Sequence, residues 1–117
     1  MAYDEVLAER IRGAISGVEG VQEMAMFGGL GFLVGGHMAV AAAGKGWLMA
    51  RVDPAETDSL ITRPGVEPFE MRGRGLTGWL LVAEDALDDE ADLREWVDRG
   101  VAYVATLPPK PRKAKKG

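Results

Sequence analysis

The side chains of this chain that are able to do chemistry are few and scattered. His37 is the only histidine, and the chain has no cysteine. A functional histidine normally has a partner that orients it, and no triad partner stands out for His37. Arg72 and Arg74, between glycines, have the chemistry to hold a phosphate or a carboxylate, but arginines at the tip of a turn are usually solvated. We therefore expect no catalytic residue, no metal ligand and no cofactor.

Two glycine-rich segments resemble phosphate-binding loops without matching them. After Gly29 and Gly31 the dinucleotide-binding fingerprint requires a third glycine, where this chain has Val34. The fingerprint also requires a helix after the glycines, and none is expected here. The segment 44–46 lacks the upstream spacing and the Ser/Thr of a nucleotide P-loop. Strand reversal explains the glycines better, because paired glycines adopt the positive φ that tight turns need. The predicted hairpin hinges are Gly28, Gly29, Gly35 and Gly36.

A run of acidic residues, Asp88, Asp89, Glu90 and Asp92, has the chemistry of a hard-cation site. Its spacing misses the calcium loop, which requires a glycine at the sixth position and a glutamate at the twelfth. Acids at the start of a helix are favoured by the helix dipole. We expect this run to begin the last helix.

Charge is distributed unevenly along the chain. Residues 1–107 carry nine basic and 18 acidic side chains, a net charge of −9, whereas residues 108–117 carry five basic side chains and no acid. Contacts from such a tail to nucleic acid would be phosphate-directed and salt-sensitive, and no aromatic residue is present in it to stack on bases. A solubilising role is the other interpretation. The candidate nucleic-acid residues are Lys110, Arg112, Lys113, Lys115 and Lys116.

Size and composition indicate one soluble domain. The chain has 117 residues, of which 47% are hydrophobic, and a domain of this length buries roughly two-thirds of its unfolded surface. The N-terminus lacks the order of a signal peptide, and no apolar run approaches the ~20 residues that span a bilayer. The absence of cysteine fits a cytoplasmic protein.

Residue periodicity and turn signals predict the element order α-β-β-β-β-α-β-β-α, in which one antiparallel sheet is covered by helices. In the first helix, Val6, Leu7, Ile11, Ala14 and Ile15 recur at helical spacing. Residues 72–75 are expected to form a turn, and Gly100, inside the last helix, is expected to be a close-packing point. The expected helices cover residues 4–16, 53–61 and 88–107, and the expected strands cover 21–27, 30–34, 37–43, 47–52, 66–71 and 78–82.

The second face of the central strands is unusual. Met38, Val40 and Ala42 are expected on one face of the third strand, and the opposite face of the sheet is lined by small residues: Gly31, Ala39, Ala41 and Ala43. A solvated antiparallel sheet normally alternates apolar with polar residues. One interpretation is a helix lying close on the small residues, and the other is a face that docks a partner.

With these residues identified, the chain resembles the TfoX N-terminal domain family, also called TfoX/Sxy. The resemblance depends on the segment 26–32, with the sequence Met-Phe-Gly-Gly-Leu-Gly-Phe, and on the glycine turn and Met38 that follow it. Gly78-Trp79 and a last helix with Leu93 and Trp96 add support. The resemblance implies a two-layer α+β fold, here a stand-alone domain of residues 1–107. The lysine-rich remainder, the basic tail 108–117, is expected from its composition to be disordered. It also implies kinship with regulators of natural competence, which assist the transcription machinery and are not enzymes.

These observations favour a small non-enzymatic protein-interaction domain that self-associates as a homodimer, because apolar or small residues lie on both faces of its central strands. Its expected protein partner, from the resemblance, is transcription machinery. An accessory nucleic-acid binder acting through the tail is the alternative. A third hypothesis is an enzyme with a pocket between the sheet and the last helix, using Arg72, Arg74 or His37.

Overall fold

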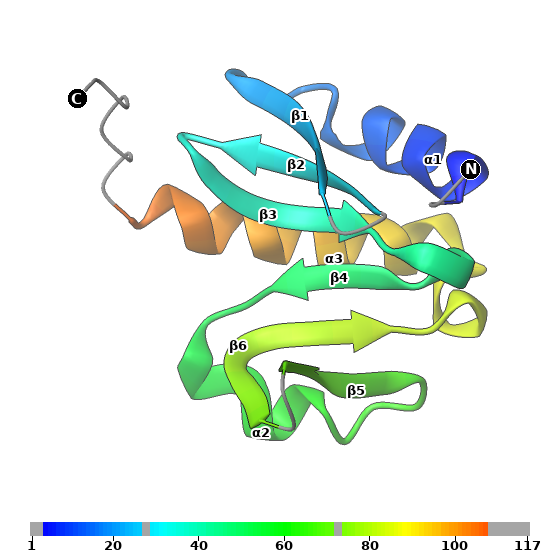
Figure 1. The fold of residues 1–117 in the computed structure, drawn as a ribbon, viewed down its shortest axis with the longest axis vertical. Helices are drawn as coiled ribbons and strands as arrows, with labels where there is room; N and C mark the ends of the chain where they lie inside the picture. The colour runs from blue at the N-terminus through cyan, green and yellow to red at the C-terminus, as the bar shows by residue number, and fades with distance from the viewer. Residues whose placement is uncertain (1–3, 27–28, 72–73, 108–117) are drawn as a thin grey trace.

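A computed structural model of the chain describes residues 4–26, 29–71 and 74–107 (Figure 1). Its strands form one six-stranded antiparallel sheet in the order β1-β2-β3-β4-β6-β5. The predicted α+β class and element order are both confirmed. The helices are α1 (Glu5–Ile15), α2 (Thr57–Leu60) and α3 (Glu90–Ala105), and short 3-10 turns are η1 (Gly44–Gly46), η2 (Pro54–Glu56) and η3 (Glu84–Leu87). The strands are β1 (Val21–Met26), β2 (Gly29–Val34), β3 (His37–Ala42), β4 (Leu48–Arg51), β5 (Val66–Met71) and β6 (Arg74–Val82).

Helix α1 begins at a side-chain cap. The Asp4 carboxylate accepts a hydrogen bond from the Leu7 amide at 3.1 Å, which satisfies one of the free N–H groups of the first turn. Leu7, Ile11 and Ile15 are buried at helical spacing. Val6 was wrongly assigned to this stripe, because it is 71% exposed. Successive helical residues are ~100° apart around the axis, so Val6 is turned away from the face that Leu7 occupies.

A β-bulge in β3 changes which side chains share a face. Phe32 lies opposite Val40, but the next residue of β2, Leu33, lies opposite Met38, so Ala39 is an extra residue. An extra residue shifts the alternation of side chains by one. The predicted grouping of Met38 with Val40 is therefore wrong: Val40 belongs to the hydrophobic core, whereas Met38 pairs with Leu33 outside it.

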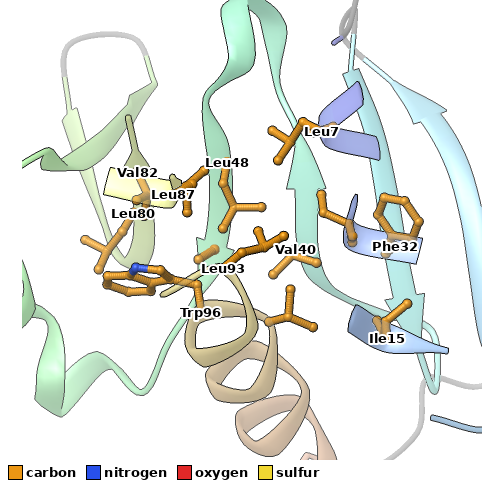
Figure 2. Close-up of a cluster of buried hydrophobic side chains, with 14 of the residues drawn as sticks. Leu7, Ile15, Phe32, Val40, Leu48, Leu80, Val82, Leu87, Leu93 and Trp96 are labelled. Carbon is orange, nitrogen blue, oxygen red and sulfur yellow. The ribbon is translucent and has the colours of Figure 1, made fainter. Parts of the chain in front are cut away.

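The hydrophobic core lies between the sheet and the helices α1 and α3. Figure 2 shows Leu93 of α3 beside Val40 and the ring of Trp96 beside Leu80 of β6, whereas Ile15 of α1 lies near Phe32 of β2. At Gly100 the helix touches the sheet backbone, since an added Cβ would meet the Ala39 carbonyl oxygen at 2.4 Å. The predicted close-packing role of Gly100 is confirmed.

The hairpin of β5 and β6 differs from its prediction. Strand β6 begins at Arg74, which pairs with Met71, so part of the expected turn at 72–75 is strand. The predicted helix 53–61 is a 3-10 turn followed by a single α-helical turn. The buried Thr57 hydroxyl accepts a hydrogen bond from the Gly78 amide at 3.1 Å, which joins this segment to β6.

Candidate functional site

A row of directly opposed residues runs across all six strands on the face of the sheet away from the core. Its members are joined pairwise by the strand register: Met24, Gly31, Ala41, Met49, Leu81 and Glu67. None of them belongs to the core cluster, although Gly31 and Ala41 are buried. Five of the six are apolar or lack a side chain, and we call them, with Glu67, the cross-sheet row.

The helices of the described chain leave this face of the sheet uncovered. In Figure 1 the strands lie in front of α3, and both α1 and α3 pack on the far side, where the core is. Of the small residues that the sequence assigned to the second face, Ala39 lies against Gly100 of α3. Gly31 and Ala41, by contrast, lie in the cross-sheet row. Both are buried, so the exposed members of the row are Met24 and Glu67, and Met49 and Leu81 are half-buried. A helix covers Ala39, whereas the cross-sheet row has the apolar composition of an interface.

The row ends at an open sheet edge, strand β1. Among the described residues this strand pairs only with β2, and residues 22–25 are exposed along it. Met24 is 50% exposed, one of two large hydrophobic side chains recorded as exposed in the described residues. The opposite edge, β5, contains Pro68 between two glutamates, and proline and charge protect an edge from pairing with another chain. Strand β1 has no proline or lysine.

The charge on β1 is neutralised by α1. Arg12 donates from Nε and Nη2 to the two carboxylate oxygens of Glu23, at 2.7 and 2.9 Å. This bidentate pair holds the pKa of Glu23 below its usual value. The single acid on the open edge therefore does not present an unpaired charge to an approaching strand.

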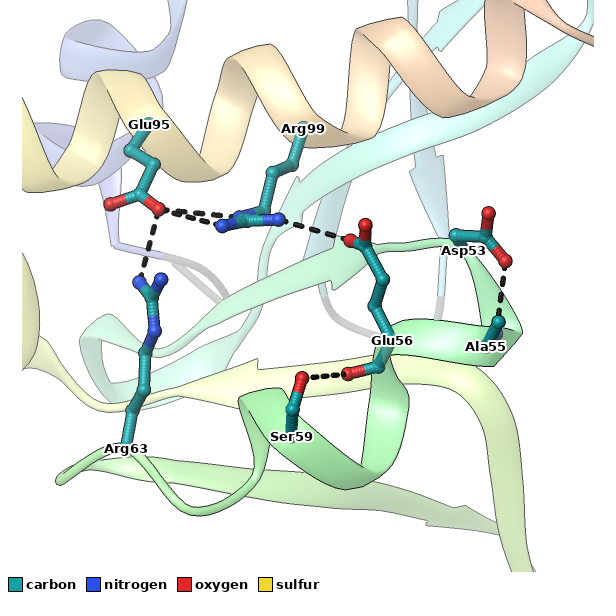
Figure 3. A network of polar contacts seen from close by, with 7 residues as sticks. All are labelled: Asp53, Ala55, Glu56, Ser59, Arg63, Glu95 and Arg99. Atoms are coloured by element: carbon teal, nitrogen blue, oxygen red, sulfur yellow. Dashed lines mark hydrogen bonds and ion pairs between the residues drawn. The ribbon is translucent and has the colours of Figure 1, made fainter.

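A second cluster of charges joins α3 to the segment around α2 (Figure 3). Glu95 accepts from Arg63 at 3.1 Å and from Arg99 at 2.9 Å, and Arg99 also reaches Glu56 at 3.0 Å. The hydrogen bond from Arg99, followed by that from Arg63, holds the pKa of Glu95 below its usual value. Both guanidinium groups lie over the ring of Trp96. Because every charge here has a partner, the cluster fastens α3 to the segment around α2.

The outer side of α3 carries a shallow depression. It is lined by Ala91, Arg94, Glu95, Asp98, Arg99 and Ala102. It is open to solvent, mixes both signs of charge and lies on the side of α3 away from the sheet. No group of three or more residues able to hold a metal ion occurs in residues 4–26, 29–71 and 74–107.

The sequence profile of the TfoX N-terminal domain matches residues 14–103. The chain belongs to the TfoX N-terminal domain family. The matched range contains the complete cross-sheet row and strand β1, and it excludes the basic tail.

A solved structure shares the fold of this TfoX N-terminal domain. The Deinococcus radiodurans protein DR2400, with a domain described as DUF419, superimposes with a TM-score of 0.68 over 94% of this chain and 95% of that chain. The two sequences are 16% identical, so the similarity is one of fold. The search of curated proteins found no match.

The residues predicted from sequence occupy ordinary structural positions where the structure describes them. His37 starts β3, half-buried and opposite Val34. Gly35 and Gly36 have φ of 62° and 85°, which confirms them as a hinge, and Gly29 starts β2. The acidic run begins α3, where the Asp89 carboxylate accepts from the Ala91 amide at 2.9 Å. Outside the described residues lie Gly28, Arg72 and the tail residues Lys110, Arg112, Lys113, Lys115 and Lys116; for Arg74 only the backbone is described.

Sequence reasoning missed one cluster in this TfoX N-terminal domain. Arg51, at the end of β4, lies over the rings of Trp79 and Tyr103. The three residues are far apart in the chain, and no motif joins them. Separately, none of the helices that the structure describes is long and apolar enough to cross a membrane.

Proposed function

We propose that this TfoX N-terminal domain is a non-enzymatic protein-interaction module that binds a second copy of itself through strand β1. The observation that carries the proposal is the exposed Met24 on an unprotected sheet edge, at the end of a row whose other members include Gly31 and Ala41. Unpaired strand edges and uncovered apolar faces are two features by which proteins recognise other chains.

Antiparallel pairing of two β1 strands about a two-fold axis suits this sequence. With Met24 opposite Met24 of the second copy, Glu23 of each strand lies opposite Ala25 of the other, and no like charges face each other. Both Met24 side chains then lie on the uncovered face, where they join the two cross-sheet rows into one. A register that placed Glu23 opposite its own copy would be less favourable.

A non-catalytic role is supported by how the charged residues are used. In the part of the chain that the structure describes, the carboxylates with displaced pKa values are Glu23 and Glu95. Each owes its displacement to an arginine that pairs with it on the surface. Ion pairs of this kind stabilise structure and do not indicate a poised acid or base.

Exchange of Met24 for lysine tests the proposal, with Val6 as a matched control. Met24→Lys places two positive charges against each other in the dimer, whereas Val6→Lys alters an even more exposed apolar side chain on α1. Light scattering after size-exclusion chromatography should find a dimer for the intact chain and Val6→Lys, and a monomer for Met24→Lys with an unchanged circular dichroism spectrum. A monomeric intact chain, or a dimer that survives Met24→Lys, contradicts the proposal.

The family adds a second partner. We propose that the dimer acts as a regulator that contacts transcription machinery, as its resemblance to competence regulators implies. Met24 and the half-buried Met49 and Leu81 on the same face of each copy offer apolar surface for that contact. Purified RNA polymerase should bind the intact chain more tightly than it binds Met24→Lys. Equal binding of the two proteins would show that contact with the polymerase does not depend on the dimer.

A further inference from the structure

Arg51 is held between elements that meet only in the folded protein. It is the last residue of β4, directly opposite Trp79 of β6, and Tyr103 reaches it from the end of α3. The guanidinium carbon lies 4.8 Å from the centroid of the Trp79 ring and 5.3 Å from that of Tyr103. Contact with two rings restricts the orientation of the guanidinium plane.

The N–H groups of Arg51 have no acceptor among the residues that the structure describes. Four other arginines differ in this respect, since each is paired with at least one carboxylate: Arg10, Arg12, Arg63 and Arg99. Ring contacts engage the faces of a guanidinium, whereas its five N–H donors lie in the plane of the group. Arg51 is half-buried, so the protein orients this guanidinium while part of the side chain stays open to solvent.

We propose that Arg51, Trp79 and Tyr103 form a binding site for a single carboxylate group attached to an apolar body. A carboxylate matches the planar fork of arginine with two parallel hydrogen bonds, and the two rings provide apolar walls beside it. A singly charged ligand suits a domain whose residues 1–107 carry −9 better than a doubly charged phosphate, which this charge would repel more strongly. Lysine would replace the fork by a point charge.

The site is separate from the proposed dimer contact. Strands β2 and β3 lie between β1 and β4 in the sheet, so Met24→Lys should leave carboxylate binding unchanged. Failure of either proposal therefore leaves the other standing. The carboxylate has two possible sources, a free organic acid and the C-terminus of a peptide.

Nuclear magnetic resonance of the full chain, labelled with nitrogen-15, tests the site directly. Benzoate should shift the Arg51 Nε–H and Trp79 indole signals in a saturable way. Arg51→Lys should weaken this binding about tenfold or more, because the fork is lost. Arg94→Lys is the matched control, since Arg94 is exposed on α3 without a hydrogen bond or ion pair recorded in the described residues.

Further ligands separate the sources and the alternatives. If the C-termini of peptides are the source, a short peptide ending in phenylalanine should compete with benzoate when its C-terminus is free. The same peptide with an amidated C-terminus should not compete. If benzoate binds and neither peptide does, the site is assigned to free organic acids. Phosphate that binds more tightly than benzoate would overturn the assignment. The absence of saturable shifts in the intact chain would also overturn it. So would an equal shift of the Trp79 indole signal in Arg51→Lys, provided that the spectrum of this variant shows it folded.

Discussion

Gly100 of α3 lies directly against the backbone of Ala39 in β3, so close that a Cβ at position 100 would come within 2.4 Å of the Ala39 carbonyl oxygen. Backbone cannot rotate away as a flexible side chain can, so this contact sets the distance between the helix layer and the sheet. It also lies at the bulge, where Ala39 is the extra residue of β3. The contact therefore joins the register of the sheet to the position of its covering helix.

Gly100→Ala should destabilise the domain by about 1–3 kcal/mol, the usual cost of overpacking, even though alanine favours a helix by about 1 kcal/mol. Gly13→Ala is the matched control, since a Cβ at that helical position meets nothing within 4 Å. It should stabilise the protein by about 0.5–1 kcal/mol. Urea unfolding followed by circular dichroism measures both, and a gain in stability for Gly100→Ala would contradict the contact.

Glu95→Gln should reduce stability at neutral pH by about 1 kcal/mol or less, since the ion pairs of Glu95 with Arg63 and Arg99 are partly exposed and screened. Because folding lowers the pKa of Glu95, its contribution is complete above the unfolded pKa of about 4.3. It is lost as the pH falls through the lower folded value. Unfolding curves across acidic pH should show the gap between wild type and variant closing in that window. Glu19→Gln, which changes an exposed acid with no ion pair recorded in the described residues, should show no such gap.

Asp89→Ala should destabilise the protein by about 1 kcal/mol through loss of the cap of α3. Asp88→Ala removes the same charge one residue earlier, at a carboxylate that accepts no hydrogen bond from the described residues, and should cost less. Thermal unfolding compares the two variants. Added calcium should leave the unfolding temperature of the wild type unchanged if the acidic run caps a helix, and a marked rise would show a cation site.

Deletion of residues 110–117 should abolish any nucleic-acid binding and leave the fold intact. The tail has five basic residues. A plot of the logarithm of the binding constant against the logarithm of the salt concentration should therefore have a negative slope no steeper than about −4.5. Fluorescence anisotropy with labelled duplex DNA measures both quantities. Binding that survives the deletion would locate the contact on the folded body.

Local features of the sequence determined most of the elements. Asp4 and Asp89 begin helices because their carboxylates cap free amides, and Gly35 and Gly36 reverse the chain because they accept positive φ. Such preferences act within a few residues and are visible in any sequence. The segment 26–32 identified the family that the profile match then established.

Tertiary structure alone decided the side-chain faces of β3 and the residues that meet at Arg51. The bulge at Ala39 depends on which amides of β2 and β3 pair, and a shift of one residue moves side chains to the other face without any change in local preference. Trp79 and Tyr103 reach Arg51 because β6 inserts beside β4 and α3 crosses the sheet. Register and strand order are chosen by the burial and pairing of residues distant in the chain, and spacing along the sequence carries no record of that choice.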